Sequence, residues 1–319
     1  MEFGIIGLGR IGSNLAIHAA EVGIRAVGFS KEVTNLDALG RHGVQVAAGL
    51  IDLVKSLHSP RVIFLSVPAG PAVDEALDRL VPFLEPWDVI VDGGNSHFRD
   101  SIARFRRLQK NKVGFVDCGT SGGLEGARSG ACFMVGGTED AVARAAPVLM
   151  KLAVEEGFFY AGPPGAGHFC KMVHNAIEFG MLQSIGEGVE LMRRSDYRID
   201  LADLFHAWSH GSVIRGWLVE LMERGLREHP DFSDVPSYVE DTGEVNWALE
   251  EAIEKEVPMP AITQSVLALF ASRGGGSDAA RAVALLRNQF GEHPFGPRPD
   301  IAKMRKTGKV GGWKADEAA

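Results

Sequence analysis

The sequence predicts an α/β domain with a doubly wound, mostly parallel sheet, followed by an all-α domain. Three observations support this fold class. Short apolar runs alternate with amphipathic segments through the first half, a glycine-rich turn follows the first run, and long helical periodicity dominates from about residue 167 onward. The Gly- and Pro-rich segment 161–165 separates the two patterns. We therefore expect domains at residues 1–165 and 166–319.

Five apolar runs of the first half show little polar alternation, which is typical of strands buried on both faces of a parallel sheet. They are Phe3–Ile6, Ala26–Phe29, Val62–Val67, Val89–Asp92 and Gly114–Asp117. The amphipathic segments between them predict helices at Ile11–Val22, Leu50–Ser56, Val73–Phe83 and Asp100–Lys110.

Helical periodicity in the second half predicts four helices, and the proline- and acid-containing stretch Arg227–Val245 predicts a loop. The helices are expected at Gly167–Met192, Asn246–Lys255, Ile262–Arg273 and Ala279–Gln289.

Composition narrows the classes of partner. The 33 Lys and Arg against 41 Asp and Glu give a net charge of −8, and no basic stripe offers a surface for nucleic acid. Cys118, Cys132 and Cys170 have spacings that fit neither a disulfide framework nor a zinc site, so no metal is expected. The N-terminus lacks the basic segment of a signal peptide and no apolar stretch is long enough to span a membrane, which predicts a cytoplasmic protein without a membrane partner.

A glycine fingerprint begins directly after the first apolar run and leads into the first predicted helix. It reads Gly7, Leu8, Gly9, Arg10, Ile11, Gly12. In a strand-turn-helix context the first glycine makes the tight turn, the second admits a pyrophosphate and the third lets the helix pack on the strand. Backbone amides at the helix N-terminus then hold the phosphates. The fingerprint predicts a dinucleotide site.

The end of the second strand bears on which nicotinamide cofactor is bound. A carboxylate there would bond the ribose 2′-hydroxyl and repel a 2′-phosphate, but the chain has Ser30 and Lys31. A hydroxyl and a cation suit a 2′-phosphate and favour NADP, while the neighbouring Glu32 leaves NAD as the alternative. Val67, at the end of the third apolar run, and Asn95, after the fourth, complete the expected cofactor contacts.

Four polar residues share one face of the first helix of the second half. Lys171, His174, Asn175 and Glu178 stand at i, i+3, i+4 and i+7. Spacing alone fits a solvated polar stripe as well as a catalytic face. The apolar flanks and the glycines before the helix favour chemistry, because a half-buried amine acts as a base near neutral pH.

In these motifs the chain resembles the decarboxylating 6-phosphogluconate dehydrogenases of the short bacterial type, within the β-hydroxyacid dehydrogenase superfamily. The motifs that carry the resemblance span most of the chain in the family's order. They are the fingerprint Gly7–Gly12, the segment 92–96 (Asp-Gly-Gly-Asn-Ser), the segments 119–123 and 125–128, the segment 165–178, and the segment 287–293 (Arg-Asn-Gln-Phe-Gly-Glu-His).

The resemblance implies a Rossmann-like cofactor domain and a metal-free reaction in three steps. Lys171 is the expected base that takes the proton of the C3 hydroxyl as hydride leaves C3. The β-keto acid then loses CO2, and Glu178 is the expected acid that protonates the enediol. The substrate's carboxylate and hydroxyls would be held by Asn95, Ser121, Gly122, Gly123, His174 and Asn175, although the glycine-rich members also suit ordinary turns. Arg287 and His293 would reach the site of a neighbouring subunit, so a homodimer or higher homo-oligomer is expected.

The chain departs from the family where the distal phosphate of the substrate is bound. Phe179 replaces the usual tyrosine, Asn246 replaces a basic residue before Trp247, and Leu269 replaces an arginine. Arg273 and the basic tail after Pro299 are the candidate substitutes. The resemblance still makes 6-phosphogluconate the leading substrate. The three departures leave 6-deoxy-6-sulfogluconate and unsubstituted gluconate as alternatives.

Two other functions stay open. A 3-hydroxyisobutyrate-type dehydrogenase shares the nucleotide domain and the lysine but oxidises without decarboxylation. A non-enzymatic nucleotide-binding sensor is the second rival, against which Lys171 and Glu178 argue.

Overall fold

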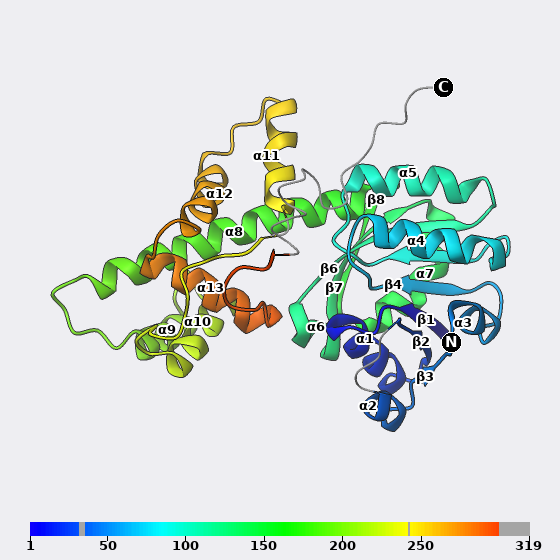
Figure 1. Cartoon of the computed structure of the whole chain (residues 1–319), viewed down its shortest axis with the longest axis horizontal. Coiled ribbons are helices and arrows are strands. Elements are labelled where there is room, and N and C mark those ends of the chain that lie inside the picture. The colour runs from blue at the N-terminus through cyan, green and yellow to red at the C-terminus, as the bar shows by residue number, and fades with distance from the viewer. Residues whose placement is uncertain (32–35, 242, 300–319) are drawn as a thin grey trace. The chain divides into compact units, whose positions relative to one another are not determined.

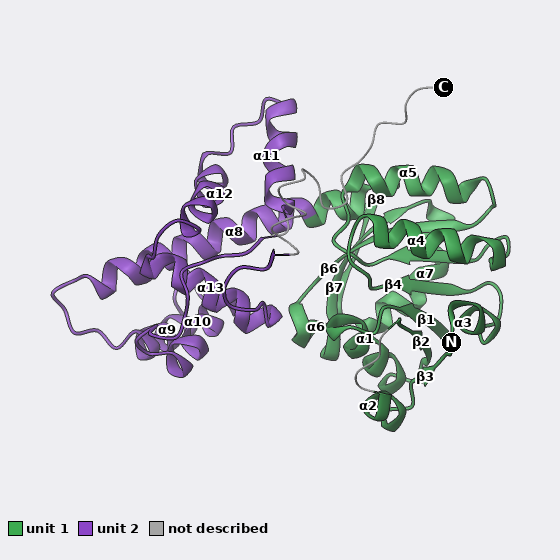
Figure 2. Ribbon diagram, in the orientation of Figure 1, with its two compact units in different colours: residues 1–171, 310–319 green, residues 172–309 purple. Residues whose placement is uncertain are grey.

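The computed structural model describes residues 1–31, 36–241 and 243–299. The chain forms two compact units, residues 1–171 and, among the described residues, 172–299 (Figure 2). The division lies inside a long helix, six residues after the expected boundary at 165. The first residues of this helix belong to the first unit because they are hydrogen-bonded to a strand of its sheet.

The first unit is built on an eight-stranded sheet with the order β3-β2-β1-β4-β5-β6-β7-β8 (Figure 1). Every neighbouring pair is parallel except β6 and β7. The doubly wound, mostly parallel fold is thereby confirmed. The strands are β1 Glu2–Ile6, β2 Arg25–Phe29, β3 Gln45–Val46, β4 Val62–Leu65, β5 Val89–Asp92, β6 Gly114–Ser121, β7 Ala131–Gly137 and β8 Ala153–Gly162.

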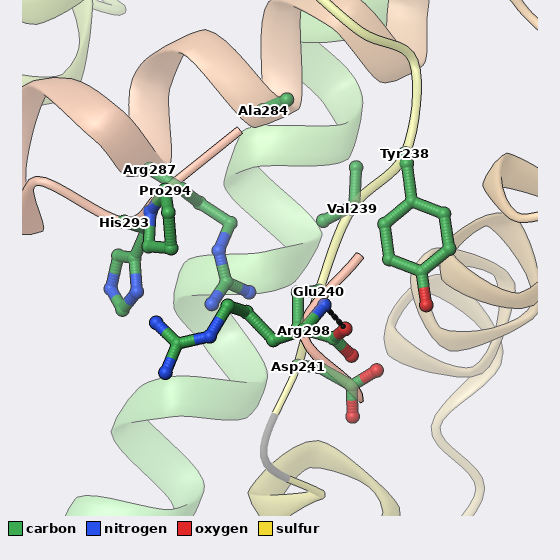
Figure 3. A pocket seen from close by; sticks show the side chains of 9 residues that line it. All are labelled: Tyr238, Val239, Glu240, Asp241, Ala284, Arg287, His293, Pro294 and Arg298. Atoms are coloured by element: carbon green, nitrogen blue, oxygen red, sulfur yellow. Dashed lines mark hydrogen bonds between the residues drawn. The ribbon is translucent and has the colours of Figure 1, made fainter. Parts of the chain in front are cut away.

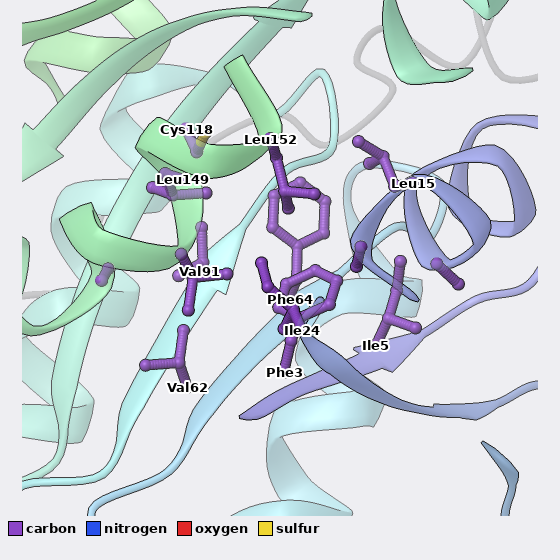
Figure 4. Close-up of a cluster of buried hydrophobic side chains, with 14 of the residues drawn as sticks. Phe3, Ile5, Leu15, Ile24, Val62, Phe64, Val91, Cys118, Leu149 and Leu152 are labelled. Carbon is purple, nitrogen blue, oxygen red and sulfur yellow. The ribbon is translucent and has the colours of Figure 1, made fainter. Parts of the chain in front are cut away.

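Helices cover both faces of this sheet, so the central strands bury alternate residues in two separate apolar clusters. Phe64 of β4 packs in one cluster with residues of α1, α6 and α7, whereas its neighbour Leu65 packs with residues of α3, α4 and α5. Figure 4 shows the first cluster. The helices are α1 Arg10–Glu21, α2 Leu36–Arg41, α3 Leu50–Lys55, α4 Pro71–Leu80, the 3₁₀ turn η1 Val81–Phe83, α5 Phe98–Gln109, α6 Gly123–Ser129 and α7 Glu139–Leu152.

The sequence patterns did not predict the strands β7 and β8. β8 lies at the edge of the sheet with much of its length exposed, so it lacks the continuous apolar run of a buried strand. β7 ends in two glycines, and a Cβ at Gly136 would lie 2.6 Å from the backbone nitrogen of Gly167. The glycines weaken the strand signal, and Gly136 permits the start of the helix that begins at Ala166 to lie against the sheet.

The second unit is helical, and all four helices predicted for it are present. They are α8 Ala166–Arg193, which begins in the first unit, α11 Glu244–Glu254, α12 Pro260–Ser272 and α13 Asp278–Gly291; α9 Leu201–Ser209 and α10 Trp217–Glu228 were not predicted. The expected loop corresponds to the stretch between α10 and α11. Across the described parts of the chain, no helix is both long and apolar enough to cross a membrane.

Candidate active site

The glycine fingerprint forms the predicted strand-turn-helix. Gly7 has a φ of +97°, which favours glycine, and a Cβ at Gly12 would lie 1.8 Å from the carbonyl oxygen of Gly7. A Cβ at Gly9, in contrast, would meet no atom within 4 Å. The first and third glycines are therefore required by the turn itself, and the second leaves space through which a ligand can approach the backbone.

A pocket with a cavity volume of about 330 Å³ opens beside this turn, at the carboxyl ends of β1, β2 and β4. Of the predicted cofactor residues, Gly7, Gly9, Ser30, Lys31 and Val67 line it. Leu8, Arg10, Ile11, Gly12 and Asn95 do not; Leu8 is buried against Gly28. The open glycine and the position at strand ends fit a dinucleotide.

Sequence reasoning missed the residues that α4 contributes to this pocket, Ala72, Glu75, Ala76 and Arg79. The Lys31 Nζ atom lies 2.8 Å from the Oε1 atom of Glu75, and both side chains are largely exposed. The turn after β4, Val67-Pro68-Ala69-Gly70-Pro71, is the signal that marks α4 as a pocket element, because it connects a buried strand end to a helix start.

The turn that carries Asn95 is held by a buried charge network. Asp92, at the end of β5, accepts hydrogen bonds from the Gly94 amide at 3.2 Å and the Ser96 hydroxyl at 2.8 Å. Arg104 of α5 lies 3.3 Å from Asp92 and also bonds Asp74 of α4 at 2.8 Å. The Arg104–Asp92 pair is buried, and a buried, hydrogen-bonded ion pair of this kind fixes backbone geometry. Asn95 thus lies in a rigid, half-buried turn at the carboxyl edge of the sheet.

The Ser121 loop also lies at this edge. Ser121 is the last residue of β6, and Gly122 and Gly123 follow it with φ angles of +113° and +61° at the start of α6. These left-handed angles turn the chain sharply from strand to helix. The predicted substrate loop is therefore in the position expected for a ligand-binding turn of a doubly wound sheet.

The start of α8 is bonded to β6 through one buried carboxylate. Asp117 is fully buried, and its two oxygens accept hydrogen bonds from the backbone amides of Gly165 at 2.7 Å and His168 at 2.9 Å. The His168 Nδ1 atom lies 2.7 Å from the Ser101 hydroxyl of α5. A carboxylate that binds helix N-terminal amides satisfies donors that have no partner within the helix. This cap fixes the first turn of α8 against the sheet.

Lys171 is placed by close packing against β6. A Cβ at Gly119 would lie 2.5 Å from the Cβ of Lys171 and 3.1 Å from the Gly167 carbonyl oxygen. The aliphatic stem of Lys171 therefore packs against the backbone of Gly119, which lies two residues before Ser121. The side chain is half-buried, as expected.

The other three members of the predicted helix face lie in the second unit. The His174 Nδ1 atom is 3.2 Å from Oδ1 of Asn175 and 3.7 Å from Oε2 of Glu178. Asn175 is buried, and His174 and Glu178 are half-buried. Because α8 is continuous from residue 166 to 193, helical spacing keeps these groups on the same face as Lys171.

Arg287 packs against α8 of its own chain. Its guanidinium carbon lies 4.8 Å from the centre of the Phe179 ring, and the side chain is buried with its Nη1 atom unbonded among the described residues. Burial lowers the pKa of Arg287, and the negative charge of Glu178 opposes that effect. This arginine reaches the Glu178 region without a second subunit.

A small pocket with a cavity volume of about 40 Å³ lies beside Arg287 (Figure 3). The Arg287 and Arg298 guanidinium groups and the His293 imidazole lie on one side of it, and the carboxylates of Glu240 and Asp241 lie on the other. Arg298 was not predicted, because it stands just before the proline taken as the start of the tail. Three basic groups, one of them a buried and incompletely bonded guanidinium, suit an oxyanion.

Arg273 and the basic tail were the predicted substitutes for the phosphate-binding residues that the family has and this chain lacks. Arg273 forms an ion pair with Asp241 and lies over the Phe270 ring, so part of its charge is already neutralised. Leu269 is buried in apolar packing. The basic tail from residue 300 onward lies outside the described residues.

Comparisons with known proteins agree over nearly the whole chain. Residues 2–162 match the model of the NAD binding domain of 6-phosphogluconate dehydrogenase, and residues 167–294 match that of the 6-phosphogluconate dehydrogenase C-terminal domain. A Haloferax volcanii protein named NAD(+)-dependent, decarboxylating 6-phosphogluconate dehydrogenase is 40% identical over 94% of this chain and 100% of its own length.

Solved structures show the same fold. Plasmodium falciparum 6-phosphogluconate dehydrogenase aligns with a TM-score of 0.78 at 24% identity, covering 100% of this chain and 67% of that one. A 3-hydroxyisobutyrate dehydrogenase from Salmonella typhimurium aligns with a TM-score of 0.71 at 19% identity, covering 89% and 99%. Together with the two matching family models, the Haloferax relative shows that the chain belongs to the 6-phosphogluconate dehydrogenase family of NAD(P)-dependent oxidoreductases.

Proposed function

We propose that the protein oxidises and decarboxylates 6-phospho-D-gluconate, or a closely related 6-substituted gluconate, to a ribulose 5-phosphate-type ketose while NAD(P) is reduced. The observation that carries the proposal is the face of α8, where Lys171, packed on the bare backbone of Gly119, is followed at helical spacing by His174, Asn175 and Glu178. The Haloferax relative, named for this reaction, supports it.

Lys171 is the proposed base. Its neutral amine takes the proton from the C3 hydroxyl, and the electron pair of that O–H bond forms the carbonyl as hydride leaves C3. The bound nicotinamide supplies the hydride acceptor. The Asp117 cap and the contact with Gly119 limit the motion of the lysine, and such positioning reduces the entropic part of the barrier.

Loss of CO2 and protonation complete the proposed reaction. The protonated amine of Lys171 donates a hydrogen bond to the new C3 carbonyl, which accepts the electron pair released when the bond to CO2 breaks. Lys171 gives its proton to that oxygen, which forms an enediol. Glu178 then donates a proton to the carbon that lost CO2 while Lys171 takes back the hydroxyl proton, and the enediol becomes a ketose. His174 lies within 3.7 Å of Glu178 and can orient its carboxyl group. Asn95, Ser121, Gly122, Gly123 and Asn175 are the proposed partners of the substrate's hydroxyls and carboxylate.

The pocket around Arg287 is the proposed site for the group at C6. Arg287, His293 and Arg298 provide basic groups for a phosphate, although three family ligands are replaced by Phe179, Asn246 and Leu269. The Arg287 guanidinium lies over the Phe179 ring, which positions it, whereas the hydroxyl that a tyrosine would supply is absent. Phosphate is therefore the proposed group, and a sulfonate or a plain hydroxyl are its rivals.

A substrate panel tests this proposal. We expect kcat/KM for 6-phosphogluconate to exceed that for gluconate by about 10²-fold or more, because each charged hydrogen bond contributes about 1.5–3 kcal/mol. Measuring kcat/KM for gluconates with phosphate, sulfonate or hydroxyl at C6 shows which of these three groups the site prefers. A higher value with sulfonate or hydroxyl would overturn the phosphate assignment.

The same assay separates the other functions. One CO2 is expected for each reduced cofactor. Cofactor reduction without CO2 would indicate a 3-hydroxyisobutyrate-type dehydrogenase, whose fold this chain shares. Cofactor binding without turnover of any hydroxy acid would indicate a sensor.

A further inference from the structure

Among the described residues, three charged side chains line the cofactor pocket next to the end of β2. Lys31 follows that strand, and Glu75 and Arg79 come from α4, one helical turn apart. The Lys31 ammonium lies 2.8 Å from the Glu75 carboxylate. The hydrogen bond from Lys31 and the positive charge of Arg79 both lower the pKa of Glu75. The carboxylate is therefore ionised at neutral pH and interacts with both cations.

This arrangement differs from the usual one in doubly wound cofactor domains. There a carboxylate at the end of the second strand bonds the ribose hydroxyls and repels a 2′-phosphate. The described residues at this strand end, Ser30 and Lys31, carry no carboxylate. Within the described part of the pocket lining, a carboxylate comes from the neighbouring helix α4, as Glu75.

We propose that Glu75 controls the discrimination between NAD and NADP in this protein. Because Glu75 is paired with Lys31, a 2′-phosphate must replace that ion pair and also approach a negative charge. A 2′-hydroxyl meets neither cost. Without the charge of Glu75, Lys31 and Arg79 would leave two positive charges in this part of the pocket, which favours a dianionic phosphate.

The test is binding of the two cofactors to the full-length protein without any sugar acid, measured by titration calorimetry. For Glu75→Gln we expect the Kd of NADP to fall about tenfold while the Kd of NAD changes less than about twofold. The matched control is Glu85→Gln, which removes an exposed, arginine-paired carboxylate that does not line the pocket. The control should leave both Kd values unchanged.

Repeating the Glu75→Gln substitution in a Lys31→Met variant tests the role of Lys31. In a Lys31→Met chain, the gain in NADP affinity caused by Glu75→Gln should fall to less than half of its size. An unchanged ratio of the two Kd values in Glu75→Gln, or a gain that persists in full without Lys31, would overturn the proposal. Since no substrate is present, either result leaves the proposed reaction untouched.

Discussion

At the scale of single residues, Lys171 carries the sharpest chemical expectation. Lys171→Ala removes the proposed base, so kcat should fall by about 10²–10⁴-fold, the usual contribution of general acid–base catalysis. The exposed Lys151 of α7 provides a matched control, and Lys151→Ala should keep full activity. Initial rates with 6-phosphogluconate and NAD(P), together with Tm values that show intact folding, check this. Undiminished turnover in Lys171→Ala would remove the lysine from the mechanism.

At the scale of elements, the contact between β6 and α8 is the feature that positions the candidate base. A Cβ at Gly167 would lie 2.5 Å from two backbone carbonyl oxygens, those of Asp117 and Met134. Backbone atoms cannot rotate away, so Gly167→Ala should destabilise the fold by about 1–3 kcal/mol and lower kcat as well.

Gly188 offers the matched control on the same helix, because a Cβ there would meet nothing within 4 Å. Gly188→Ala should raise Tm slightly, since alanine is the better helix former by about 1 kcal/mol. Thermal unfolding of both variants measures the difference. Equal Tm values for the two would mean that the first turn of α8 is not fixed by this contact.

At the scale of the whole molecule, α8 presents an apolar stripe that argues for self-association. Val173, Ile177 and Met181 recur every four residues and are 38%, 51% and 50% exposed. Exposed apolar stripes of this kind mark interfaces, and a second copy of the same chain is the commonest partner. We expect a homodimer or higher homo-oligomer by light scattering.

A charge placed in the stripe should dissociate this oligomer. Met181→Glu is expected to give monomers, whereas Met150→Glu, at an equally exposed apolar position on α7, should leave the mass unchanged. A monomeric parent protein, or an oligomer that persists in Met181→Glu, would contradict the prediction.

The elements that could be predicted from the sequence are those with a strong local signal. β1, β2, β4 and β5 are continuous apolar runs, and α8 is a long amphipathic segment after a glycine-rich turn. β8, in contrast, is an edge strand whose burial is incomplete, and β7 is shaped by glycines that make room for α8. Both patterns depend on neighbours that the local sequence does not reveal.

The sequence by itself determined the fold class, the glycine turn for the dinucleotide and the face of α8, because these rest on periodicity and on steric rules that act over a few residues. Only the tertiary structure decided which charges meet. Lys31 pairs with Glu75, and Arg287 lies over the Phe179 ring. Arg298 lines the same pocket as Arg287. These contacts connect residues far apart along the chain, so they exist only after the helices and strands have packed.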